Sequence, residues 1–370
     1  MKFDQYLEGD GKYDYLRYNT PEYNLEDQNI MILEELKMKS SKGKHTFDRK
    51  RKYFFALNLF NNEEIIPYMI QEISLLIKFL GPENTFLSIY ENGSHDKTKE
   101  LLHDFESFLN ELDVRFSIVT ENSKRPEIYH RIGYLAEIRN RALKPLEKEE
   151  KKGFIYDKII FFNDILFCLN DILELLYQSD LQRSDITSPL DVHGVGNPRQ
   201  LDFRDSWVAR DIGGEDLYGS LKNLVKHKET GKRYNEGLPL QVQCSWNGVS
   251  VLNAEPFYGK DPIRFRRSNA ETKECAASEC SLICNDYWRK GYRRIVLVPN
   301  ILVGYKMETA NLIDDNYQKF IDLNSTLPEK IKYVDGPEKV YCRGLEKNNT
   351  NIPDTPSVWI KYTDGDTKVY

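Results

Sequence analysis

Apolar stretches of strand length alternate with amphipathic stretches of helix length between residues 53 and 163. The runs YFFALNLF, TFLSIY and KIIFF are almost continuously apolar, which is typical of strands buried on both faces of a parallel sheet. The expected strands are 53–60, 85–90, 114–120 and 158–162, and the expected helices between them are 65–81, 99–112 and 131–143. This alternation predicts an α/β fold with a doubly wound, mostly parallel sheet flanked by helices.

The alternation weakens after residue 180, where loops rich in Gly, Asp, Arg and Trp predominate. Shorter strands are expected at 241–246, 249–254 and 294–305. The first residues are polar and rich in lysine, and the last are rich in Pro, Asn and Asp. We expect three parts: a polar leader or stem over 1–50, one large domain over 51–325, and a tail over 326–370 that packs on it.

Composition excludes several classes of protein. The 370 residues carry 52 Lys and Arg against 58 Asp and Glu, a net charge of −6, whereas nucleic-acid binders usually have a basic surplus. No apolar run approaches the ~20 residues that span a bilayer, which predicts a soluble chain. The six cysteines are too few for a disulfide scaffold, so we expect free core thiols or one or two disulfides.

Polar side chains follow the predicted strands at one edge of the sheet, where ligands of doubly wound folds bind. Residues 91–98 (ENGSHDKT) come directly after the second strand. Gly93 allows a tight turn there, and Ser94 or Asp96 can cap the next helix. The segment suits an ordinary capped turn, and it also suits a turn in which Glu91 receives hydrogen bonds from a nucleoside.

Asn163 and Asp164 end the strand KIIFF at the same edge. A carboxylate in that position can hold Mg²⁺ or Mn²⁺, which bridges the phosphates of a nucleotide sugar. We therefore expect Asp164 as the metal ligand with Asn163 beside it. The alternative is that the aspartate only caps a turn.

Helical periodicity places Arg139 on the apolar stripe formed by Ile132, Leu135, Ala136 and Leu143. An arginine that faces inward needs an anion, because an unpaired buried charge costs about 3–5 kcal/mol. A carboxylate of the core and the diphosphate of a ligand are the two candidate partners.

The second half offers carboxylates together with Trp and Asn, a combination that suits a sugar site because rings stack on sugars and acids bind hydroxyls. The candidates for the acceptor or sugar are Asp205, Trp207, Arg210, Trp246, Asn247 and Gly248, and the candidate catalytic residues are Glu279 and Asp211. Each of them also suits ordinary core or turn material.

These motifs together resemble the fungal capsule-associated α-1,3-mannosyltransferase family, glycosyltransferase family 69. The resemblance runs from about Phe54 to Tyr305 and includes, in order, ALNLFNNEEIIP, SIYENGSHDKT, RIGYLAEIRNRAL, IIFFNDILF, DSWVARDIGG, CSWNG and ASECSLI. It implies a GT-A-type fold, Rossmann-like, with an irregular acceptor-side half. It also implies GDP-mannose as donor, a saccharide or glycan acceptor, and Mn²⁺ or Mg²⁺ as cofactor.

The resemblance further implies an α-1,3 linkage formed with retention, and a place in the Golgi lumen behind a membrane anchor that this chain lacks. The donor-binding residues would be Asn58, Glu91, Asn92, Asp96, Arg139 and Asn163. Ser281 follows Cys280 where the family often has a second cysteine, so acceptor and linkage can differ here. Two alternatives stay open: another donor, such as UDP-xylose or UDP-glucose, and a catalytically silent glycan-binding relative. A hydrolase is disfavoured because the sequence has no Gly-x-Ser-x-Gly or His-Glu-x-x-His motif.

Overall fold

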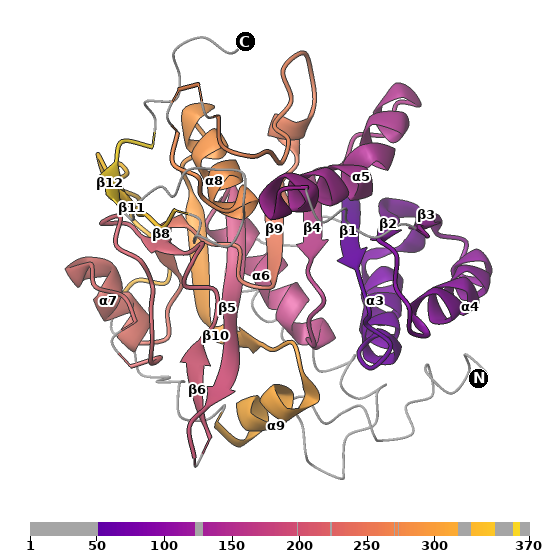
Figure 1. Ribbon diagram of the computed structural model, residues 1–370, viewed down its shortest axis with the longest axis horizontal. Helices are drawn as coiled ribbons and strands as arrows, with labels where there is room; N and C mark the ends of the chain where they lie inside the picture. The colour runs from indigo at the N-terminus through magenta and orange to yellow at the C-terminus, as the bar shows by residue number, and fades with distance from the viewer. Residues whose placement is uncertain are drawn as a thin grey trace.

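The first half of the computed structural model follows the predicted alternation (Figure 1). The structure describes residues 51–122, 129–197, 199–222, 224–269, 271–272, 274–316, 327–344 and 358–362. The elements are β1 Tyr53–Leu59, α3 Ile66–Leu80, η2 Pro82–Asn84, β2 Thr85–Glu91, α4 Thr98–Glu111, β3 Arg115–Thr120, α5 Arg131–Lys151 and β4 Lys158–Phe162. All four predicted strands and all three predicted helices are confirmed, with α5 continuing past its predicted end.

Ten strands of the described residues form one sheet, in the order β3-β2-β1-β4-β9-β5-β10-β8-β7 with β6 paired to β5. The later strands are β5 Ile186–Val195, β6 Gln200–Phe203, β7 Arg210–Asp211, β8 Leu240–Cys244, β9 Val249–Asn253 and β10 Ile295–Val303. β1 lies parallel to β2 and β4, β2 to β3, and β5 to β10. β9 and β8 oppose their neighbours, so most strands share one direction and the predicted mostly parallel sheet is confirmed.

Alternate side chains of β1 point into two cores on opposite faces of the sheet. Phe54 and Ala56 pack with α5 and with α8 Glu279–Arg289. Phe55 and Leu57 pack with α3, α4 and α6 Leu169–Leu181. Helices therefore cover both faces, as a doubly wound sheet requires, and the carboxyl ends of the strands stay open for a site.

The strands expected at 241–246, 249–254 and 294–305 are confirmed as β8, β9 and β10. The expectation of loops after residue 180 is wrong for β5, a long strand beside β10. Its sequence, ITSPLDVHGV, mixes polar residues into the apolar run, so periodicity does not reveal it. The polar groups find partners inside the core: the Ser188 and Ser250 hydroxyls, for example, are 2.8 Å apart. The remaining helices are α7 Lys228–Asn235, η3 Glu255–Phe257 and α9 Met307–Asn316.

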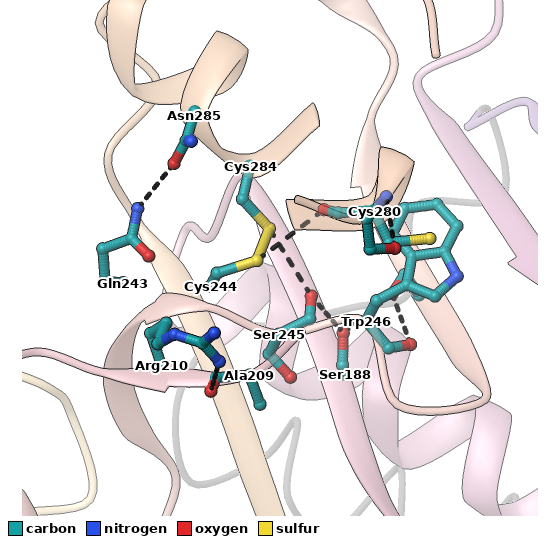
Figure 2. The surroundings of a disulfide bond; sticks show 12 residues. Ser188, Ala209, Arg210, Gln243, Cys244, Ser245, Trp246, Cys280, Cys284 and Asn285 are labelled. Carbon is teal, nitrogen blue, oxygen red and sulfur yellow. Dashed lines mark hydrogen bonds between the residues drawn. A yellow bond between two sulfur atoms is a disulfide. The ribbon is translucent and has the colours of Figure 1, made fainter. Parts of the chain in front are cut away.

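Two disulfides brace the second half of the chain. Cys244 of β8 is bonded to Cys284 of α8 (Figure 2), and Cys275 is bonded to Cys342. Cys342 ends β11 Val340–Cys342, which pairs antiparallel with β12 Val358–Ile360. The expectation of one or two disulfides is thus confirmed.

The leader expected over 1–50 lies outside the described residues, and so does 317–326, where the boundary with the tail was expected. The division of the chain into three parts therefore stays a prediction. Among the residues that the structure describes, no helix combines the length and the apolar character needed to cross a bilayer.

Candidate active site

A cleft of about 790 Å³ opens where the parallel strands end. The ends of β1, β2 and β4 contribute to its walls together with β5, α5 and the first turn of α8. Nine of the predicted site residues line it: Asn58, Asn92, Arg139, Asn163, Asp164, Asp205, Trp207, Trp246 and Glu279. The cleft therefore lies at the edge of the sheet where the sequence predicts a ligand.

Arg139 extends from α5 to the beginning of α8. Its Nε donates a hydrogen bond to Glu279 Oε1 at 3.0 Å, and its Nη1 donates to Asn163 Oδ1 at 3.1 Å. Three aromatic rings lie 5.2–5.5 Å from the guanidinium carbon: Phe161, Trp246 and Phe265. Of the two partners that the sequence allows for Arg139, the structure provides the carboxylate.

Glu279 is the first residue of α8, and its side chain is only 3% exposed. The N-cap residue Ser278 accepts a hydrogen bond from the backbone nitrogen of Cys280 at 3.2 Å, which fixes the start of the helix. The disulfide of Cys284 then ties the next turn of α8 to β8 (Figure 2). The helix terminus and the disulfide together hold the carboxylate at the cleft.

Asn163 connects the end of β4 to three other parts of the cleft. Its backbone nitrogen donates to Gly248 O at 2.7 Å, and its Nδ2 donates to the Tyr305 hydroxyl at 3.1 Å. Its Oδ1 accepts from Arg139 and, at 3.4 Å, from Trp246 Nε1. Both ends of the amide are therefore engaged within the protein, although the residue lines the cleft as predicted.

Asn247 and Gly248 follow Trp246 in the turn between β8 and β9 and do not line the cleft. Asn247 Nδ2 donates to Pro189 O at 2.8 Å. Gly248 has a φ of +82°, and a Cβ atom there would lie 2.9 Å from Cγ2 of Val303. Only glycine satisfies both conditions, so these two residues act in shaping the turn that carries Trp246 rather than as sugar-binding side chains.

Asp164 lies at the end of β4, and its Oδ2 accepts a hydrogen bond from Asn62 Nδ2 at 3.1 Å. Burial raises the pKa of its carboxyl group, and the nearby charges of Arg204 and Arg139 oppose that rise. A cation would relieve the same desolvation, because it stabilises the ionised form.

The residues of the cleft that the sequence did not predict include three that belong to its polar lining: Asp191 of β5, Arg204 after β6, and Tyr305 after β10. Asp191 is fully buried and accepts hydrogen bonds from Asp205 N at 3.2 Å and from the Tyr305 hydroxyl at 3.4 Å. Burial and the neighbouring Asp205 carboxylate raise the pKa of Asp191. Burial and Glu279 raise the pKa of Asp205.

A signal for one of these three was available in the sequence, because Tyr305 ends the predicted strand 294–305 at the functional edge of the sheet. Arg204 and Asp191 depend on β5 and β6, which the pattern does not reveal.

Glu91 and Asp96 do not reach the cleft. Glu91 is fully buried, and its carboxylate accepts hydrogen bonds from the backbone nitrogens of Ser94 and Glu121. Asp96 accepts from Glu63 N and Thr98 N, each at 3.0 Å. Of the two interpretations of residues 91–98, these contacts match the capped turn, and Asn92 is the residue of the turn that lines the cleft.

Asp211 and Arg210 also lie outside the cleft. The two carboxylate oxygens of Asp211 accept from four backbone nitrogens of its own loop region: Gly213, Glu215, Lys226 and His227. Arg210 donates to the carbonyl oxygens of Ser206, Ala209 and Tyr341. The polar groups of both side chains are hydrogen-bonded to backbone atoms, which leaves them less available to a substrate.

Comparisons with known proteins identify relatives. The chain is 29% identical over 305 residues to alpha-1,3-mannosyltransferase CMT1 of Cryptococcus neoformans var. neoformans serotype D, a match covering 78% of this chain. It spans 63% of the length of that relative.

Solved structures that resemble the chain include the mannosyltransferase PcManGT from Pyrobaculum calidifontis in complex with GDP-Man and Mn²⁺. That match has a TM-score of 0.40 at 9% identity and covers 74% of this chain and 63% of the other. Another is S. aureus TarS 1-349 in complex with UDP, with a TM-score of 0.38 at 15% identity, covering 68% and 60%. Residues 52–286 match the family described as Cryptococcal mannosyltransferase 1, and the chain belongs to that family.

Proposed function

We propose that this protein transfers mannose from GDP-mannose to a hydroxyl of a saccharide acceptor, forming an α-1,3 linkage with retention and using Mn²⁺ or Mg²⁺. One observation carries the proposal: a single cleft contains Asp164 at the end of β4 and the buried Arg139–Glu279 pair. Membership of a family described as mannosyltransferases supports the choice of sugar.

The donor side of the cleft is formed by Asn58, Asn92 and Asp164 at the ends of adjacent strands. Asn58 Nδ2 donates to Ile138 O at 2.9 Å, while its buried Oδ1 has no hydrogen-bond partner among the described residues. An unpaired buried acceptor is costly and is satisfied by a ligand donor such as a ribose hydroxyl or a base N–H. We assign the nucleoside to Asn58 and Asn92.

Asp164 is the residue that would hold a divalent cation. The cleft supplies hard oxygen donors, which Mg²⁺ and Mn²⁺ prefer. In the described ranges, no group of three or more His, Cys, Asp or Glu side chains is arranged to hold a metal. The donor set fits a cation shared between one carboxylate, water and substrate phosphates, as Mg²⁺ is usually bound. When bound, the cation would stabilise the charge of the departing diphosphate.

Glu279 is our candidate for the carboxylate closest to the reacting carbon. Arg139 pairs with it at 3.0 Å and thereby fixes its orientation. Trp207 forms part of the wall of the same cleft and is half-buried, so its ring offers a surface for a sugar, and Asp205, two residues before it, offers a carboxylate for sugar hydroxyls. This wall is assigned to the acceptor.

We place the protein in the secretory pathway, in the Golgi lumen. The Cys244–Cys284 and Cys275–Cys342 disulfides support an oxidising compartment.

The test is release of free nucleotide by the purified protein from GDP-mannose, UDP-xylose and UDP-glucose, with Mn²⁺ or with EDTA, and with mannosyl acceptors. We expect turnover of GDP-mannose, and not of the two UDP sugars, in the presence of Mn²⁺ and no turnover in EDTA. Asp164→Asn should abolish transfer without changing the unfolding temperature, whereas Glu137→Gln, which alters an exposed carboxylate of α5, should leave transfer intact. Transfer in EDTA would refute the metal role, and the absence of turnover with every donor would favour a glycan-binding protein.

A further inference from the structure

Three arginines line the cleft, and they differ in what their side chains already bind. Arg139 donates to Glu279 and Asn163. Within the described residues, the guanidinium groups of Arg131 and Arg204 have neither a hydrogen bond nor a salt bridge to another side chain, and both are exposed. A ligand anion can therefore bind either of these two without displacing a protein partner.

Arg204 is held close to the acidic side of the cleft. Its backbone nitrogen donates to Asp191 O at 3.0 Å, which anchors the residue to β5. Its guanidinium carbon lies 3.5 Å from the centroid of the Tyr305 ring, a cation–π contact. The Tyr305 hydroxyl is in turn bonded to Asn163 and Asp191, so the ring beneath Arg204 is fixed.

The charge of Arg204 also influences the carboxylates of the cleft. Its charge acts on Asp164, Asp191 and Asp205, the three aspartates of the cleft. Arg204 therefore places a cation in the same cleft as the carboxylate to which we assign the metal ion, close enough for its charge to lower the pKa of that carboxylate. Phosphate oxygens bound to that ion would therefore be attracted electrostatically by the Arg204 guanidinium.

We propose that Arg204 binds the diphosphate of the nucleotide-sugar donor and that Arg139 instead positions Glu279. This inference rests on the proposed function, because it takes the ligand of the cleft to be a nucleotide sugar. The planar guanidinium suits phosphate oxygens, which accept two parallel hydrogen bonds from it.

Arg139 is the less suitable cation for the diphosphate. If its Nε turned toward a phosphate, Glu279 would lose the partner of its charge while its side chain is only 3% exposed. An uncompensated buried carboxylate is strongly unfavourable. Within the part of the chain that the structure describes, Arg204 has no such charged partner to release, so phosphate would compete only with the contact between its guanidinium and the Tyr305 ring.

The experiment measures the affinity of the purified protein for GDP with Mn²⁺ by isothermal titration calorimetry. We expect Arg204→Ala to weaken GDP binding roughly 10- to 100-fold, the effect of losing one or two hydrogen bonds to a charged group. Arg204→Lys should lose less GDP affinity than Arg204→Ala, because lysine keeps the positive charge but cannot donate two parallel hydrogen bonds to a phosphate. Arg131→Ala is the matched control, since it removes an equal charge from the same cleft, and it should change GDP affinity by no more than about twofold.

The outcomes separate this inference from the proposed function. Wild-type binding of GDP together with unaltered binding by Arg204→Ala would overturn the role of Arg204 alone. Equal losses of GDP affinity in Arg204→Ala and Arg131→Ala would also overturn the role of Arg204, because they would indicate that only the total positive charge of the cleft matters and not a direct contact with the diphosphate. Failure of the wild-type protein to bind any nucleoside diphosphate would instead refute the proposed donor. Because the side chain of Arg204 is exposed, Arg204→Ala should have the same unfolding temperature as the wild-type protein. An unchanged unfolding temperature would exclude misfolding as the cause of weaker GDP binding.

Discussion

Glu274 offers a quantitative test of the electrostatics that hold α8 in place. Arg266 donates two hydrogen bonds to the Glu274 carboxylate, at 2.6 and 2.8 Å, and the backbone nitrogen of Asn269 donates another at 2.8 Å. Arg266 also donates to Asp286 of α8 at 2.7 Å. The cluster therefore ties the segment before Cys275 to the helix that carries Glu279.

The perturbation is Glu274→Gln, which keeps the shape of the side chain and removes its charge. Burial alone would raise the pKa of Glu274, but Arg266, the backbone nitrogen of Asn269 and Arg289, whose Nη2 donates to Oε1 at 3.1 Å, together lower it from 4.5 to about 2. This difference corresponds to about 3.4 kcal/mol at 1.36 kcal/mol for each pH unit. Arg266 is 30% exposed, so solvent screening reduces the expected loss to about 2–3 kcal/mol.

The sign of the pH dependence follows from the lowered pKa. A carboxyl group that is more acidic in the folded state stabilises it above the unfolded pKa, and that stabilisation disappears as the pH falls through the folded pKa. The free-energy difference between wild type and Glu274→Gln should be constant above about pH 5 and should shrink steadily from there toward pH 2.

The assay is urea unfolding followed by tryptophan fluorescence at several pH values between 7 and 3. Glu229→Gln is the control, because it alters an exposed carboxylate paired with Lys232 and should cost no more than about 0.5 kcal/mol. A loss that is the same at pH 3 and pH 7 would refute the electrostatic explanation. So would a loss no larger than that of the control.

Two further predictions concern the frame of the cleft. Gly248→Ala should destabilise the protein by about 2–4 kcal/mol, because it combines a positive φ with a clash against Val303; an unchanged thermal unfolding midpoint would contradict this. Cys342→Ser should cost about 4 kcal/mol by the chain-entropy relation for a separation of 67 residues. Denaturant unfolding measures this loss, and Cys275→Ser should match it, with no further loss in the double variant; additive losses would show that each sulfur acts independently of the bond.

Sequence periodicity was sufficient for the strands of the first half because parallel strands covered by helices on both faces are continuously apolar. It also located Arg139 and Asp164, since an arginine on an apolar helical stripe and an aspartate at the end of a buried strand are local signals. Periodicity did not predict β5, because its sequence contains polar residues, including Asp191, whose hydrogen-bond partners are distant in the sequence. A pattern of single residues carries no information about such partners.

The candidate site shows the same limit in another form. Glu91 and Asp211 have the residue type that a ligand site needs, yet their carboxylates are saturated by backbone nitrogens of nearby loops. Sequence identifies an acceptor group but does not identify what donates to it. Arg204 is the converse case: among the described residues its guanidinium has no hydrogen bond or salt bridge to another side chain, only a contact with the Tyr305 ring, and the role that we propose for it rests on that geometry.

The strand β11 has a consequence for dissecting the protein into fragments. Trp207, which we propose for the acceptor, donates from Nε1 to Arg343 O at 2.9 Å, and the neighbouring Arg210 donates to Tyr341 O. Residues 341 and 343 therefore support side chains that precede them by more than 130 positions. A fragment cut at the predicted domain boundary near 325 would keep the residues that we propose for the donor and lose the backbone contacts behind Trp207 and Arg210. If the proposed assignments hold, such a fragment should bind the nucleotide and fail to bind the acceptor.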